Sequence, residues 1–123
     1  MNTMLVAAAL ALSGAASDQP GKRSAHPLAG EWTVDLRPAP SAPAYLKPMV
    51  LNVAADGSLS GTFYDNAIQA GRADAANRIC FAFRTADPSG LYQTSGCLEG
   101  GEIEGQTWSE GRGFLLSWSA KRP

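Results

Sequence analysis

The chain has 123 residues, of which 45% are hydrophobic and 17% are charged. This length is enough for one compact domain and too short for two. Ten Lys and Arg stand against 11 Asp and Glu, so the net charge is −1, and neither sign is collected into runs. This balance argues against nucleic acid or an anionic membrane surface as a partner.

The first element is an apolar run over residues 4–12, which small residues follow at positions 13–16. This pattern is typical of a signal peptide, and the run is too short to span a bilayer, which needs roughly 20 apolar residues. We expect a signal peptide over residues 1–16, export to the periplasm or the medium, and a mature chain without a transmembrane span. The alternative is that the run forms a helix in the core.

Residues 17–28 are polar with Pro and Gly, which predicts a flexible lead-in. After them, short segments of alternating apolar and polar residues, separated by turn signals, continue to residue 123. Such spacing is typical of a single all-β domain, here over residues 29–123. We predict eight strands, over residues 30–37, 48–54, 58–64, 67–73, 76–86, 91–99, 102–109 and 112–120.

The pairing of these strands also predicts how the two cysteines are placed, because opposed residues on antiparallel strands share a face. A loop over residues 87–90 sets Cys80 opposite Cys97 and Phe83 opposite Thr94. In the oxidising compartment that export implies, we expect a Cys80–Cys97 disulfide on the outside of the sheet. Such a link contributes about 3 kcal/mol to stability.

Other turns give the remaining strands one common apolar face. The turn after Phe63 pairs it with Ile68, and the turn at residues 110–111 pairs Ile103 with Trp118. Such strands can form an up-and-down barrel or a flattened sandwich. We predict an eight-stranded antiparallel up-and-down β-barrel, because closure pairs the first and last strands and removes both exposed edges.

Four inward positions have little or no side chain, namely Gly61, Ala70, Gly96 and Gly105. They either leave a cavity or relieve crowding and let the strands coil. Enough aromatic residues are available to fill the barrel, which favours relief of crowding over a cavity.

The segment Gly30-Glu31-Trp32 resembles the Gly-x-Trp entry to the first strand of the calycins, the lipocalin and avidin superfamily of β-barrels. In that superfamily the Trp packs at the closed end of the barrel beneath an Arg or Lys from the last strand. The resemblance therefore implies that Arg122 lies over Trp32, with Trp118 on the same inward face.

Residues 56–63, DGSLSGTF, resemble the second hairpin of avidin-type barrels. Phe63 stands where those proteins have a ligand-contacting Tyr, Asp65 stands where they have a Ser, and Val34 is among the hydrophobic residues that replace the polar ones after Gly-x-Trp. These departures argue against biotin as the ligand.

Alternate connections of an up-and-down barrel gather at one end, so one opening is expected between residues 38–48, 65–66, 87–90 and 110–111. The first connection is proline-rich and therefore stiff. Tyr45 and Leu46 can fold over the opening as a lid, or the connection is a solvated loop with one hydrophobic anchor.

A polar ring is expected at this opening, above a floor of Phe63, Phe83 and Phe114. An arginine with neighbouring hydroxyl groups can hold a carboxylate or another anion while the floor takes a hydrophobic tail. The alternative is that these strand ends are polar because water reaches them. The candidate ligand-binding residues are Thr85, Tyr92, Thr107, Ser109, Arg112 and Tyr45.

Enzyme chemistry has little support. The single histidine, His26, lies in the lead-in, and no nucleophile, metal or phosphate motif stands out. We therefore expect no catalytic residues, no metal and no cofactor. We expect a module that binds a small hydrophobic or amphipathic molecule. The alternative is a protein partner, as for an envelope-associated factor or the bacterial periplasmic metalloprotease inhibitors, which the chain resembles in size and barrel type.

Overall fold

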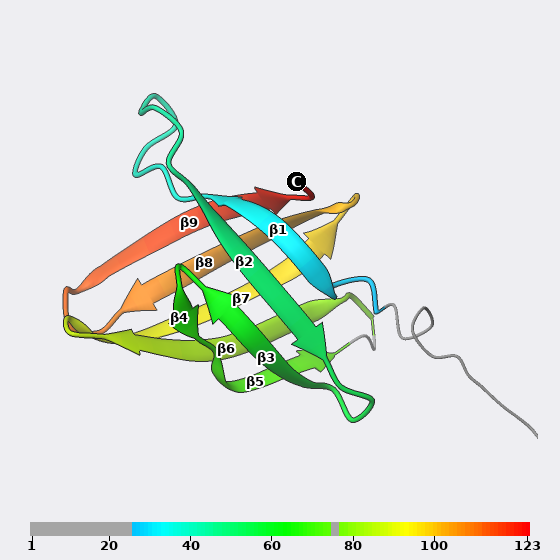
Figure 1. Cartoon of the computed structure of the whole chain (residues 1–123). Helices are drawn as coiled ribbons and strands as arrows, with labels where there is room; N and C mark the ends of the chain where they lie inside the picture. Colours follow the sequence, from blue (N-terminus) through cyan, green and yellow to red (C-terminus); the bar gives the residue numbers. More distant parts are fainter. Residues whose placement is uncertain (1–25, 75–76) are drawn as a thin grey trace, which may run out of the picture.

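The computed structural model describes residues 26–74 and 77–123 (Figure 1). The expected signal peptide (1–16) and residues 17–25 of the lead-in lie outside this range. The described residues contain no helix that is long and apolar enough to cross a membrane. The strands are β1 (Gly30–Asp35), β2 (Leu46–Val53), β3 (Ser58–Phe63), β4 (Asn66–Ala67), β5 (Gln69–Asp74), β6 (Cys80–Asp87), β7 (Gly90–Glu99), β8 (Glu102–Ser109) and β9 (Phe114–Lys121).

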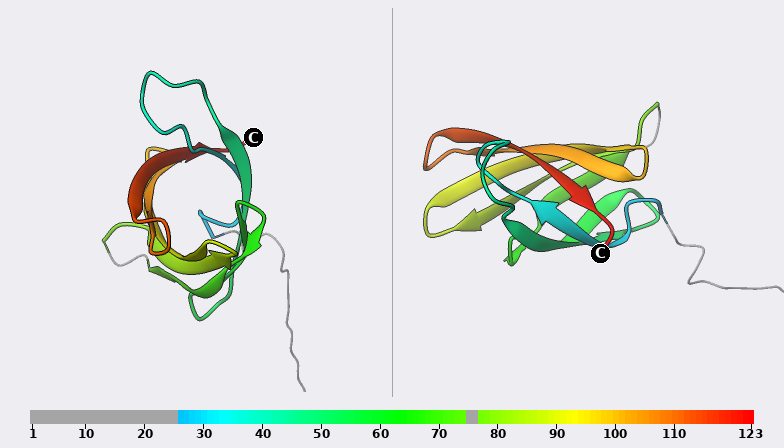
Figure 2. Two further views of the ribbon diagram at one scale, coloured as in Figure 1. Left: turned by 90° about the vertical axis from the view of Figure 1, so that its left-hand side faces the viewer. Right: turned by 90° about the horizontal axis from the view of Figure 1, so that it is seen from above.

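These strands form a closed antiparallel barrel. Their order is β2-β1-β9-β8-β7-β6-β5-β3-β4, and the pairing of β2 with β3 closes the ring. Because β4 and β5 both pair with β3, they together fill one place in the barrel, which confirms the predicted eight-stranded barrel. The first and last strands pair as expected, with Val34 opposite Ala120. The view along the barrel in Figure 2 shows the ring end-on.

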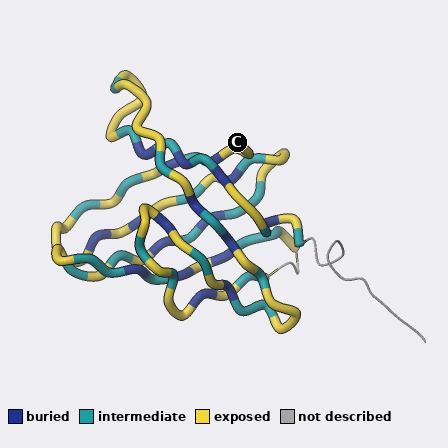
Figure 3. Tube along the Cα trace, in the orientation of Figure 1, coloured by how far each residue is buried: buried dark blue, intermediate teal, exposed yellow. Residues whose placement is uncertain are grey.

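One side of each strand faces the core. Buried and exposed residues alternate along most of the trace (Figure 3). The predicted pairing of Phe83 with Thr94 is confirmed, and Leu98 lies opposite Ile103 on the next strand. The buried apolar residues are Leu28, Trp32, Val34, Leu36, Met49, Leu51, Leu59, Phe63, Phe81, Phe83, Ile103, Trp118 and Ala120.

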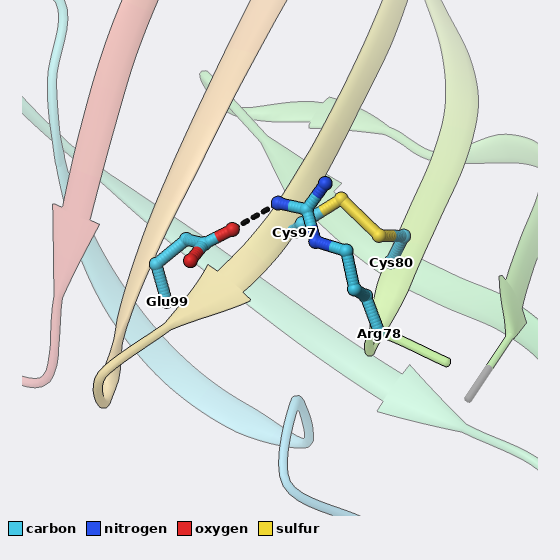
Figure 4. Close-up of a disulfide and its surroundings, with 4 residues drawn as sticks. All are labelled: Arg78, Cys80, Cys97 and Glu99. Carbon is cyan, nitrogen blue, oxygen red and sulfur yellow. Dashed lines mark hydrogen bonds and ion pairs between the residues drawn. A yellow bond between two sulfur atoms is a disulfide. The ribbon is translucent and has the colours of Figure 1, made fainter. Parts of the chain in front are cut away.

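The disulfide joins the middle strands on their outer face. Cys80 and Cys97 are directly opposed on β6 and β7 and are bonded, as predicted. Figure 4 shows the ion pair of Arg78 with Glu99 beside it. This ion pair is exposed and therefore contributes little to stability.

The β8–β9 turn is two residues longer than predicted. Gly113 has a φ of 69° and its N–H donates to the carbonyl of Ser109 at 2.8 Å. As a result Ile103 lies opposite Ala120, and the predicted pairing of Ile103 with Trp118 is wrong. A shift by two residues keeps every side chain on its face, so alternation cannot distinguish the two registers.

The β3–β4 turn is also displaced. Tyr64 and Asp65 have φ values of 53° and 65°, which is the conformation of a two-residue hairpin turn whose twist matches its strands. Phe63 therefore lies opposite Asn66, and its predicted pairing with Ile68 is wrong.

A bulge interrupts the predicted strand over residues 67–73. Ala70 has a φ of 53°, and the register against β6 shifts between Gln69 and Arg72. The extra residue changes which side chains face inward. Ala70 is exposed, contrary to its predicted inward place, and Gly71 is buried instead. A Cβ on Gly71 would lie 2.5 Å from the carbonyl oxygen of Leu59.

Aromatic side chains fill the space over two of the inward glycines. A Cβ on Gly105 would lie 2.4 Å from the Trp118 ring, and a Cβ on Gly96 would lie 2.9 Å from the Phe81 ring. These glycines relieve crowding and do not leave a cavity beneath the opening.

The end of the barrel where the chain enters is closed by Trp32. The Arg122 guanidinium carbon lies 3.9 Å from the centroid of the Trp32 ring, and Arg122 donates hydrogen bonds to the carbonyls of Pro27 and Ala29. The Trp32 indole N–H donates to the carbonyl of Leu28 at 2.9 Å. Leu28, at the end of the expected lead-in, is fully buried because it seals this end.

Candidate functional site

The opposite end of the barrel holds a cavity of about 280 Å³. The left view of Figure 2 looks toward this end. Its volume lies just below the range of roughly 300–1,000 Å³ that is usual for small-molecule sites. The lining residues are Leu36, Tyr45, Phe63, Tyr64, Asn66, Thr85, Asp87, Tyr92, Thr107, Arg112, Phe114 and Leu116. We call this space the mouth cavity.

Five of the six candidate ligand-binding residues line the mouth cavity, namely Tyr45, Thr85, Tyr92, Thr107 and Arg112. Ser109 does not line it. Ser109 is fully buried, and its hydroxyl oxygen accepts a hydrogen bond from the backbone N–H of Arg112 at 3.2 Å. Ser109 therefore shapes the turn that carries Arg112.

The floor of the cavity is apolar. Phe63 and Phe114 line it, as expected, together with Leu36 and Leu116. Phe83 is not in the lining; its ring lies 5.4 Å from the centroid of Phe63 and supports it in the core.

Thr107 and Thr85 are both buried, but their hydroxyl groups have different surroundings. The Thr107 hydroxyl bonds to that of Thr94 at 2.9 Å and accepts from the Trp118 indole N–H at 3.0 Å. Thr85 is 2% exposed, and its hydroxyl has no hydrogen-bond partner within the described ranges 26–74 and 77–123. Buried polar groups are nearly always hydrogen-bonded, so the Thr85 hydroxyl is an unusual feature of this cavity.

Asp87 is a lining residue that the sequence pattern assigned only to a turn. One carboxylate oxygen accepts from the backbone N–H of Ser89 at 2.8 Å, which caps the β6–β7 turn. The other accepts from the Tyr92 hydroxyl at 3.1 Å. The mouth cavity therefore contains a carboxylate as well as the expected cation.

Arg112 reaches the cavity from the β8–β9 turn and not from a strand. Its guanidinium carbon lies 4.9 Å from the centroid of the Phe114 ring. In the part of the chain that the structure describes, Arg112 forms no ion pair. A guanidinium carries five N–H donors, so this one has free donors for a bound anion.

Two tyrosines meet at the rim. The hydroxyl oxygens of Tyr45 and Tyr64 are 2.5 Å apart, and the Lys47 ammonium lies 5.7 and 5.1 Å from the two ring centroids. The hydrogen bond with Tyr45, together with desolvation, raises the pKa of Tyr64 above its ordinary value of 10.0. The Tyr64 hydroxyl therefore remains neutral near pH 7.

The loop at residues 36–45 does not cover the opening. Figures 1 and 2 show it projecting to the side of the barrel. Tyr45 lines the cavity, whereas Leu46 is 57% exposed and does not. Of the two alternatives, the structure therefore has the solvated connection with one hydrophobic anchor, Tyr45, and not the lid.

Asp35 braces this loop. Its carboxylate accepts from the Arg37 side chain at 2.6 and 2.9 Å and from the backbone N–H of Tyr45 at 3.2 Å. Hydrogen bonding by the Arg37 guanidinium lowers the pKa of Asp35 from 3.8 to about 2, and the backbone bonds from Tyr45 and Arg37 act in the same direction. Tyr45 is thus held at the rim by a charged group.

Replacing Asp35 by asparagine is expected to flatten the pH dependence of stability in acid. Because the folded-state pKa is lowered, the contribution of Asp35 is complete above its unfolded value of 3.8 and is lost as the pH falls toward 2. The check is the urea midpoint of wild type and Asp35→Asn at several pH values across this window. If the urea midpoints of the two proteins changed in parallel with pH, the Asp35 carboxylate would not stabilise the fold in this way.

The chain matches no protein-family model, no curated protein and no solved structure. Among residues 26–74 and 77–123, no group of three His, Cys, Asp or Glu side chains could hold a metal ion. The mouth cavity, with its apolar floor and its unpaired polar groups, is the candidate functional site.

Proposed function

We propose that the protein is an exported binding module that holds one small amphipathic molecule in the mouth cavity. The observation that carries this proposal is Thr85, a buried lining residue of the cavity whose hydroxyl has no hydrogen-bond partner in the described part of the chain. Leaving such a group unsatisfied costs about 1–3 kcal/mol. A ligand that hydrogen-bonds to Thr85 removes this cost, so the site favours the bound state.

The rest of the lining supports an amphipathic ligand. Phe63, Phe114 and Leu116 offer an apolar surface, while Tyr92 and Arg112 offer polar groups around it. Pockets that bind small molecules usually combine a mostly apolar lining with a few polar groups that orient the ligand. The role we propose is binding and involves no catalytic residue.

We also propose that the protein is exported and that it belongs to the calycin superfamily. The Cys80–Cys97 disulfide supports an oxidising compartment. The Gly30-Glu31-Trp32 segment, with Arg122 stacked on Trp32, supports the calycin assignment together with the eight-stranded barrel.

Native mass spectrometry of the mature protein, purified gently from its own host, tests the binding role. The wild-type protein is expected to retain a small molecule, and Thr85→Val is expected to lose it at the same collision energy. In the ligand-free state, Thr85→Val is expected to be more stable than wild type by about 1 kcal/mol, because an unsatisfied hydroxyl has been removed.

Thr94→Val is the matched control. Thr94 is buried on the neighbouring strand and does not line the mouth cavity, and its hydroxyl is bonded to that of Thr107. This variant is expected to lose about 1 kcal/mol of stability and to keep the bound molecule. If the purified wild-type protein carries no small molecule, or if Thr85→Val retains it as well as Thr94→Val does, the proposed site is wrong.

A protein-binding role is the second candidate. Trp108 and Leu115 are opposed on the outer face of β8 and β9 and are 44% and 60% exposed. They lie beside a shallow hollow of about 350 Å³. An exposed tryptophan favours contact with another protein, because tryptophan is enriched among the residues that carry most of the binding energy of interfaces. An oxidised monomer without a ligand in the same mass spectra would favour this function.

A further inference from the structure

Two opposite charges line the mouth cavity without neutralising each other. Arg112 and Asp87 are both lining residues, and neither belongs to an ion pair in the described part of the chain. We infer that the molecule bound there is a small zwitterion with an apolar body, an inference that rests on the proposed function. Its carboxylate meets Arg112, and its ammonium meets Asp87.

The anionic end of the ligand is assigned to the β8–β9 side of the cavity. The Arg112 guanidinium carbon lies 4.9 Å from the centroid of the Phe114 ring, a cation–π contact that helps to hold the guanidinium at the cavity. A guanidinium can form two parallel hydrogen bonds with one carboxylate. The Ser109 hydroxyl, which accepts from the backbone N–H of Arg112, supports the turn that positions the guanidinium.

The cationic end is assigned to the β6–β7 side. Thr85 and Asp87 lie two residues apart on β6, and Tyr92 lies opposite Thr85 on β7. The Asp87 carboxylate receives one hydrogen bond from Ser89 and one from Tyr92, whereas a carboxylate can accept about four. It therefore has capacity for an ammonium group, and aromatic rings such as those of Tyr92 and Tyr64 attract a cation further.

A singly charged ligand fits this pair less well. A simple carboxylate would pair with Arg112 but would bring a second negative charge into the cavity that holds Asp87. A simple amine would leave Arg112 unpaired and repelled. Arg112 is exposed and Asp87 is half-buried. Only a zwitterion pairs both charges at once, and this discriminates against either singly charged analogue. The volume of about 280 Å³ restricts the ligand to a small molecule such as an apolar amino acid.

The test is isothermal titration of the mature, oxidised protein with two matched series. One series is phenylalanine, 3-phenylpropionate and 2-phenylethylamine; the other is leucine, 4-methylpentanoate and 3-methylbutylamine. Each series keeps the apolar body and changes only the charged groups. In at least one series the zwitterion is expected to bind 10-fold or more tightly than both singly charged analogues.

Two variants test the contributions of Asp87 and Arg112 separately. Asp87→Asn keeps the acceptor for the Ser89 N–H and is expected to weaken the zwitterion about 10-fold without weakening the carboxylate analogue. Arg112→Gln is expected to weaken the zwitterion about 10-fold without weakening the amine analogue. Glu110→Gln is the control, because Glu110 lies at the same end of the barrel, bonds to Gln93 and does not line the cavity. It is expected to bind all six compounds as wild type does.

The outcomes distinguish this inference from the proposed function. If a singly charged analogue binds as tightly as its zwitterion in both series, the zwitterion is ruled out while binding in the mouth cavity stands. If none of the six compounds binds, the inference is likewise overturned, and the retained molecule in native mass spectra decides the proposed function separately. Equal effects of Asp87→Asn on the zwitterion and the carboxylate would also overturn it.

Discussion

Trp118→Ala is expected to lower the free energy of unfolding by about 3–5 kcal/mol, the usual cost of removing a large aromatic side chain from a core. Trp118 is 4% exposed, its ring lies 5.4 Å from that of Phe63, and its indole N–H donates to the Thr107 hydroxyl. The ring also covers Gly105, which has no side chain to fill the void. Urea unfolding of both proteins measures the difference.

Trp108→Ala is the control for this prediction. The substitution is the same and the strand is the neighbouring one, but Trp108 faces outward and is 44% exposed. Its loss is expected to cost about 1 kcal/mol or less, because surface substitutions have small effects. Similar losses for the two variants would mean that Trp118 does not pack the core as described.

Removing the disulfide by the double substitution Cys80→Ala and Cys97→Ala is expected to lower the free energy of unfolding by about 3 kcal/mol. The two cysteines are 17 residues apart in the sequence, and cross-linking a loop of this length restricts the unfolded chain by about that amount. The measurement is urea unfolding of the oxidised wild type and of the double variant. The barrel is expected to remain folded, since both side chains lie on the outer face.

Wild-type protein treated with a thiol reductant is the matched control. Its urea midpoint is expected to fall to that of the double variant, while the double variant does not respond to the reductant. If reduction leaves the wild-type midpoint unchanged, the disulfide does not contribute to stability in this way.

Much of the barrel could be predicted because antiparallel pairing and side-chain alternation constrain each other. Once the loop at residues 87–90 is assigned, Cys80 must face Cys97 and Phe83 must face Thr94, and both pairings are present. The three errors, at the turns after Phe63 and Ser109 and at Ala70, concern backbone conformation. At Tyr64, Asp65 and Ala70 the φ is positive although none is a glycine, and such residues leave no clear signal in the sequence. After Ser109, alternation is satisfied by both registers, because they differ by two residues.

The candidate site was predictable in its location more than in its chemistry. The strand ends that surround the opening follow from the topology, and so does the inward register that led to Thr85, Tyr92 and Thr107. Asp87 was missed because an Asp before Pro88 is an ordinary turn residue, and its side chain faces Tyr92 only after β6 and β7 pair.

By itself, then, the sequence determined the strands, the barrel and the disulfide, because these depend on a period of two and on the positions of turns. Only the tertiary structure decided which polar groups are free to bind. Thr85 and Thr107 are equivalent in the sequence pattern, yet Trp118 and Thr94 occupy the hydroxyl of Thr107 and leave that of Thr85 without a partner in the described chain. These hydrogen-bond partners lie on the neighbouring strands, 13 and 11 residues away along the chain, so their presence depends on how the strands pair and pack.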